Sequence, residues 1–186
     1  MTTARSQTWL AIFFIVMGAI LRVTRHVGWL PLPPNFAPVS AMGLFSASRL
    51  PRKYGVLVPL GLMLLSDAVI GFDRWTITLA VYLSFLASAG LGFWLRRRVS
   101  FGRWIFATLA GSVIFFLVTN AAVWMFGKIY PSSIIGLWQS YIAGLPFFRN
   151  TLAGDLVYSS MFFGLHHLVV VYFRQRALAR DLPPHG

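Results

Sequence analysis

The sequence contains no cysteine, and all four of its acidic residues are aspartates. The absence of cysteine excludes a disulfide scaffold, a thiolate metal site and a cysteine nucleophile. Charged residues make up only 11% of the 186-residue chain, whereas apolar residues make up 58%. Soluble domains contain about 25% charged and about 45–50% apolar residues. The composition therefore excludes a cytosolic enzyme, a disordered tail and a coiled coil.

The net charge of +12 does not indicate a nucleic-acid partner. The basic residues lie in short clusters between long apolar stretches, which is typical of an integral membrane protein with basic cytoplasmic loops. Such a protein has the lipid bilayer as its main partner. The lysine and arginine residues divide unevenly between the two sides of the predicted membrane domain, with eleven of the sixteen on the side of the N-terminus. The positive-inside rule then predicts a multi-pass membrane protein with both termini in the cytoplasm.

Six apolar segments predict an all-α bundle of six transmembrane helices. The second segment is short, because eleven or twelve helical residues cover only about 16–18 Å of a hydrocarbon core of about 30 Å. We expect neighbouring residues to extend this segment, or the rest of the protein to shield it from lipid. Residues 1–173 are expected to form one membrane domain, and residues 174–186 a polar cytoplasmic tail that need not be ordered. The six segments span residues 8–21, 37–48, 54–70, 75–95, 104–126 and 154–173.

Polar residues gather on the predicted outer side and indicate a ligand pocket that opens there. Asp67 is the most informative of them, because it lies inside an apolar run where a charge needs a partner or a cavity. Arg149 is its expected partner, either in a structural ion pair or in a ligand site. Asp155 is expected to cap the start of the sixth helix or to line the pocket. Asn35 is expected to be a turn residue or part of a lid.

Three further candidates lie on the same side. His26 is either an interfacial side chain or a ligand-binding residue. The predicted outer connection, residues 127–153, contributes Trp138 and Asn150.

No catalytic or metal-binding motif is complete in the chain. Gly111-Ser112 does not complete the nucleophile motif of a rhomboid-like protease, and Ala153-Gly154-Asp155 lacks the first glycine of an intramembrane aspartyl protease motif. His166 and His167 point about 100° apart on a helix and are expected to pack rather than to bind a metal. We therefore predict no catalytic residue, and the sequence leaves any metal unidentified.

Three phrases of the sequence resemble a family of small bacterial membrane proteins related to the S components of energy-coupling-factor vitamin transporters. They are Asn35-Phe36-Ala37-Pro38-Val39-Ser40-Ala41-Met42, Leu64-Leu65-Ser66-Asp67, and Leu145-Pro146-Phe147-Phe148-Arg149-Asn150-Thr151-Leu152 with Gly154-Asp155. Solitary vitamin B12 transporters of the BtuM type are similar to this group. The likeness covers about residues 8–173.

This resemblance implies an S-component-like six-helix bundle that takes up cobalamin or another corrinoid from the periplasm. His26, Asp67, Tyr82 and Arg149 are the positions that it matches to polar site residues. The chain departs from relatives that bind cobalt through a cysteine thiolate, and its first helix lacks the Ala-x-x-x-Ala pattern that many S components use for docking.

The function that we expect from the sequence is a substrate-binding transporter for a vitamin-like small molecule. Cobalamin is the first expected substrate, as a transported ligand and not as a catalytic cofactor. A membrane enzyme that modifies a corrinoid or lipid at the outer face is the alternative, and a non-transporting scaffold is another. We expect a monomer, and an ATPase module of the energy-coupling-factor type as partner is left open.

The charge distribution generates a topology prediction. A reporter that is active only in the periplasm should be inactive when it is fused at residue 186, because the basic side of the bundle is retained in the cytoplasm. The same reporter inserted in the 127–153 connection should be active and serves as the control. Activity of the fusion at residue 186 would reverse the orientation.

Overall fold

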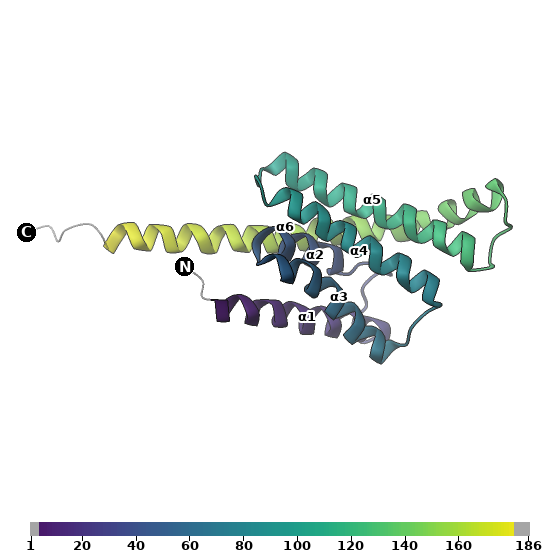
Figure 1. The fold of residues 1–186 in the computed structure, drawn as a ribbon, viewed down its shortest axis with the longest axis horizontal. Helices are drawn as coiled ribbons and strands as arrows, with labels where there is room; N and C mark the ends of the chain where they lie inside the picture. Colours follow the sequence, from purple (N-terminus) through teal and green to yellow (C-terminus); the bar gives the residue numbers. More distant parts are fainter. Residues whose placement is uncertain (1–3, 181–186) are drawn as a thin grey trace, which may run out of the picture.

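A computed structural model describes residues 4–180 as a bundle of six α-helices, with no strand in that range. Successive helices run in alternating directions, so that the described chain begins and ends at the same end of the bundle (Figure 1). We call this the terminal end, and the other the opposite end. The helices are α1 (Ala4–His26), α2 (Val39–Arg49), α3 (Arg52–Ile70), α4 (Trp75–Leu95), α5 (Phe101–Phe126) and α6 (Ile134–Arg180).

Five of the six helices are long and apolar enough to cross a membrane, and α2 is the exception. Their lengths are sufficient to cross a bilayer, and many of their apolar side chains are exposed, which agrees with the predicted multi-pass membrane protein. The predicted bounds of the fourth segment coincide with α4. α3 and α5 begin only two and three residues before their predicted segments, whereas α1 and α6 extend beyond theirs by a turn or more at both ends. The prediction of an all-helical membrane domain is therefore confirmed at this level.

The short second segment is shielded by protein. α2 has only 11 residues, and all of those from Val39 to Ser48 are buried. It contacts α1, α3, α4, α5 and α6, and so lies in the middle of the bundle. Because the other helices surround it, an element of about 16 Å exists in the membrane domain without exposing its ends to lipid.

The sixth helix differs from the prediction. The expected connection at residues 127–153 is short, because α6 begins at Ile134 and continues for 47 residues. Its start is stabilised by Ser133, whose Oγ accepts a hydrogen bond from the Gly136 N–H at 3.2 Å, as an N-cap side chain does. Pro146 lies within the helix without ending it, as membrane helices tolerate. Residue 173 is not a boundary either, since residues 174–180 continue α6; the remainder of the expected tail, residues 181–186, lies outside the described chain.

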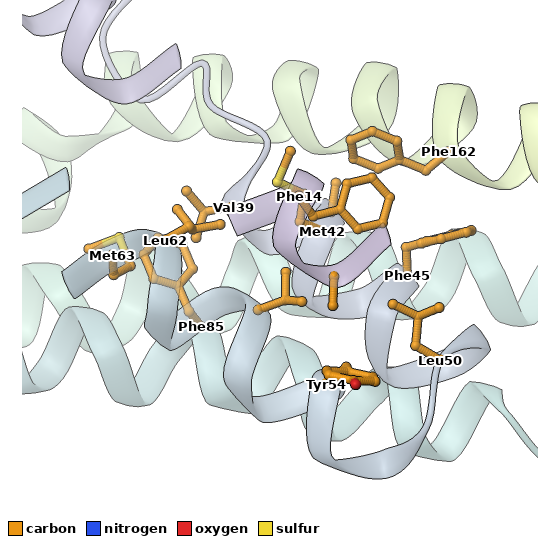
Figure 2. Packing of buried hydrophobic residues seen from close by; sticks show 13 residues of the cluster. Phe14, Val39, Met42, Phe45, Leu50, Tyr54, Leu62, Met63, Phe85 and Phe162 are labelled. Carbon is orange, nitrogen blue, oxygen red and sulfur yellow. The ribbon is translucent and has the colours of Figure 1, made fainter. Parts of the chain in front are cut away.

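Aromatic side chains from three helices form the centre of the core. Figure 2 shows Phe14 of α1, Phe45 of α2 and Phe162 of α6 lying close together. The ring centroid of Phe14 lies 5.6 Å from that of Phe45 and 5.2 Å from that of Phe162. Such tilted aromatic pairs add about 0.5–1.5 kcal/mol each beyond burial of area. The cluster therefore fixes α1 and α6 against α2.

Glycine allows the backbones of α2 and α4 to approach closely. A Cβ atom added at Gly92 would lie 2.5 Å from the carbonyl oxygen of Leu44 and 2.7 Å from the Cβ of Ala47. No side chain fits there without moving α2. Small residues at such crossings are the usual means of close helix packing in membranes.

We predict that Gly92→Ala destabilises the protein, because the new methyl group must displace the α2 backbone. Overpacking of this kind costs about 1–3 kcal/mol, which should appear as a melting temperature several degrees lower in detergent. Gly90→Ala is the matched control, since a Cβ at Gly90 has no neighbour within 4 Å. Equal melting temperatures for the two variants would contradict this packing.

Candidate functional site

A buried ion pair joins α1 to α3 near the opposite end of the bundle. Arg22 donates from Nη1 to Asp67 Oδ1 at 2.7 Å and also hydrogen-bonds Ser66 Oγ. Tyr82 of α4 donates its hydroxyl proton to Asp67 Oδ2 at 2.7 Å. The side chain of Asp67 is only 8% exposed, and that of Arg22 is 21% exposed. Both oxygens of Asp67 are thus engaged, and the carboxylate fixes the position of Arg22.

The expected pairing of Asp67 with Arg149 is wrong. Arg149 is exposed on α6, and the ion pair of Arg22 with Asp67 is the single salt bridge within residues 4–180. The reason is topological, because α3 packs against α1, α2 and α4 but not against α6. Tyr82, which the resemblance matched to a polar site residue, lies on α4 and reaches the same carboxylate from a neighbouring helix.

A cavity of about 190 Å³ opens beside Arg22. It lies beneath the loop of residues 27–38, among the walls formed by α1, α2, α4, α5 and α6. Its apolar lining comes from Ala37, Val39, Val81, Phe85 and Phe115. Its polar lining comes from Arg22, Arg25, Asn35, Ser40, Thr151 and Asp155. The cavity therefore combines an apolar interior with both basic and acidic groups.

The loop over the cavity packs closely on α6. Asn35 adopts a left-handed conformation, with φ of 63°, which asparagine tolerates better than most residues and which agrees with its predicted role in a turn. The next residue, Phe36, lies against Gly154, where an added Cβ would be 3.3 Å from the Phe36 Cα. The Phe36 ring also packs on Tyr158 at 5.4 Å. These contacts hold the exposed side chain of Asn35 at the rim of the cavity.

Asp155 is the most deeply buried charged residue of the cavity, with 2% of its surface exposed. Ser112 of α5 donates to its Oδ2 at 2.7 Å, and Ser40 of α2 also lies beside the carboxyl group. Its Oδ1 is buried without a hydrogen-bond partner among the described residues. The expectation that Asp155 caps the start of a helix is wrong, because α6 begins 21 residues earlier.

Arg25 supplies a second buried polar atom without a partner. Its Nε is buried and forms no hydrogen bond within the described chain. Arg22 and Arg25 are three residues apart on α1, so that both face the cavity. In the sequence, the two arginines indicate only membrane topology. Their i, i+3 spacing on an apolar helix was the available sign that they share one face.

The remaining candidates do not line this cavity. His26 is exposed at the end of α1, and Asn150 is half-buried on α6. Trp138 is 64% exposed and belongs to an apolar surface groove with Leu137 and Tyr141. Of the predicted residues, the structure thus brings Asn35 and Asp155 into the cavity, and Asp67 and Tyr82 behind its Arg22 wall. No group of three or more metal-ligating side chains occurs between residues 4 and 180.

Comparison with known proteins gives one match. The profile of the family described as "Family of unknown function (DUF6580)" matches residues 2–178, which include nearly the whole helical bundle and every residue of the cavity. No curated protein and no solved structure matches the chain significantly.

We predict that Arg22→Gln and Asp67→Asn each destabilise the protein, because each leaves one charge of a largely buried pair without its partner. Fully buried pairs lose about 3–5 kcal/mol in this way, and the partial exposure of Arg22 reduces the expected loss to about 2–3 kcal/mol. The double variant should recover much of the loss, and thermal unfolding of the full chain measures this coupling. Arg149→Gln is the control and should leave stability unchanged. Strictly additive losses in the double variant would disprove the coupling.

Proposed function

The chain belongs to the DUF6580 family, whose function is unknown, and we propose that it is a substrate-binding membrane transporter for a small, vitamin-like molecule. The observation that supports this most is the cavity beneath residues 27–38. Two of its lining residues, Arg25 and Asp155, each have a buried polar atom, Nε and Oδ1, that has no hydrogen-bond partner in the described chain. Buried polar groups are normally satisfied, so unsatisfied ones that share a cavity favour a ligand site.

The proposed direction of transport is inward from the periplasm. The cavity is lined by Arg22 and Arg25 near the end of α1 and by Asn35 and Ala37 of the following loop. Figure 1 shows that α1 ends at the opposite end of the bundle. The more basic terminal end is the cytoplasmic one under the positive-inside rule. In this orientation the cavity opens to the periplasm of a bacterial inner membrane. An S-component-like architecture, with its central short helix and outward-facing pocket, is part of the same proposal.

The first proposed substrate, cobalamin, imposes a structural requirement. Pockets for drug-sized ligands measure about 300–1,000 Å³, and this cavity measures about 190 Å³. A corrinoid ring with its nucleotide loop is much larger than that. Uptake of a corrinoid therefore requires the loop of residues 27–38 to move away from α6 and widen the cavity, whereas a smaller vitamin-like molecule fits the cavity as it stands.

We propose that the substrate-binding unit is a monomer. The short α2 is surrounded by helices of its own chain, so that no second subunit is needed to shield it from lipid. Transport by this monomer alone is measurable without an energising ATPase module. No observation on the cavity favours the enzyme or the scaffold over the transporter.

Proteoliposomes that contain the full chain should take up at least one compound from a defined mixture of water-soluble vitamins that includes cobalamin. Mass spectrometry of the washed vesicles measures both the identity and the integrity of the compounds inside. Uptake should fall at least tenfold for Arg25→Gln, which removes a charge from the cavity wall. Arg149→Gln, which changes an exposed arginine outside the cavity, is the matched control.

Each other result has a defined meaning. Equal vesicle contents with and without the protein would disprove the transporter for every compound in the mixture. A compound that is chemically altered but does not enter would indicate the membrane enzyme instead. Entry of cobalamin would require the widening of the cavity described above.

A further inference from the structure

Two oppositely charged side chains face the same cavity without neutralising each other. Arg25 comes from α1, and Asp155 comes from α6. No ion pair joins them, so every Arg25 nitrogen lies more than 4.0 Å from the Asp155 oxygens. Four side-chain nitrogen or oxygen atoms are buried without a hydrogen-bond partner in the described chain, and these two residues supply the pair that shares a cavity.

A neighbouring contact positions Asp155, and the Asp67 carboxylate on the α3 side of Arg25 is already paired with Arg22. Asp155 is held through its Oδ2 by the Ser112 hydroxyl, which leaves Oδ1 as the free acceptor. The neighbouring Arg22 is committed to Asp67, so that this carboxylate does not neutralise Arg25. The cavity thus offers a positioned acceptor on Asp155 and an unpaired guanidinium donor on Arg25.

Much of the remaining wall is apolar. Val81 and Phe85 of α4 and Phe115 of α5 line it together with Val39 of α2. A hydrocarbon segment of a ligand finds a matching surface there. The volume of about 190 Å³ limits the ligand to a short molecule.

We propose that the cavity binds a small zwitterion of amino-acid type, with an anionic group on Arg25, a protonated amine on Asp155 and a short hydrocarbon segment between them. This inference rests on the proposed transporter function and specifies its substrate class. Binding gives each unpartnered group a charge-assisted hydrogen bond, and the ligand enters without net charge. A purely anionic or purely cationic molecule satisfies only one of the two groups.

Three matched series of compounds test this on the purified full chain in lipid nanodiscs. The zwitterions are the ω-amino acids from β-alanine to 6-aminohexanoate, which vary the separation of the two charges. The controls are the linear carboxylates and the linear amines of the same chain lengths. Isothermal titration calorimetry should find at least one zwitterion that binds ten or more times more tightly than its matched carboxylate and amine.

Two variants then assign the ends of the ligand. Asp155→Asn keeps side-chain size, whereas Arg25→Gln removes the charge and shortens the side chain, and each should weaken binding of the best zwitterion at least tenfold. In Arg25→Gln the zwitterion should bind no better than the matched amine, a change of preference that a loss of folding does not produce. Asp73→Asn is the control, because Asp73 is exposed in the loop after α3 and lies outside the cavity.

The proposal is wrong if the amines bind as tightly as the zwitterions, which would indicate a cation site at Asp155 alone. It is equally wrong if the carboxylates do so, or if no zwitterion binds. These comparisons use the unaltered protein and decide the matter even where Asp155→Asn fails to fold. Uptake of a vitamin into proteoliposomes without zwitterion binding would overturn this inference and leave the transporter standing. Zwitterion binding without uptake of any compound would overturn the proposed transporter and leave the zwitterion site standing.

Discussion

The shielding of α2 is the constraint on which the rest of the bundle depends. A helix of 11 residues is about half as long as the hydrocarbon core of a membrane, so that its end groups would meet lipid if it stood at the surface. Unsatisfied backbone groups in hydrocarbon cost several kcal/mol each. The five long helices therefore surround α2, and glycine at position 92 allows α4 to lie directly against its backbone. The N-terminal residues of α2, Val39 and Ser40, form part of the lining of the polar cavity.

The lengths of the hydrophobic runs predict most of this fold, because a helix needs about 20 predominantly apolar residues in a row to cross the hydrocarbon core. The bounds of α4 could be read directly from Trp75 and Leu95. The start of α6 could not, since the segment before Ala153 mixes glycine, proline and polar residues. Its helical state depends on a cap at Ser133 and on packing against α5. Propensity is a weak guide where tertiary contacts decide the outcome.

The candidate site was harder to predict than the fold, because it depends on which helices are neighbours. Asp67 and Asp155 stood out as aspartates beside or within apolar runs, but their partners, Arg22 and Ser112, are 45 and 43 residues away in sequence. Arginines near helix ends are already explained by membrane topology, so the sequence gives no separate sign that they pair with an aspartate or line a cavity. Only the packing of α1 against α3 reveals that one arginine is paired and that Arg25, one turn later, is not.

The length of α6 gives the bundle a lever arm. Its 47 residues extend for about 70 Å, more than twice the hydrocarbon thickness. Asp155 lies 25 residues from the last residue of the helix, a distance of about 38 Å, so a 10° tilt about that point moves the end by about 6–7 Å. A small tilt of α6 at the cavity wall therefore produces a large displacement at the terminal end of the bundle.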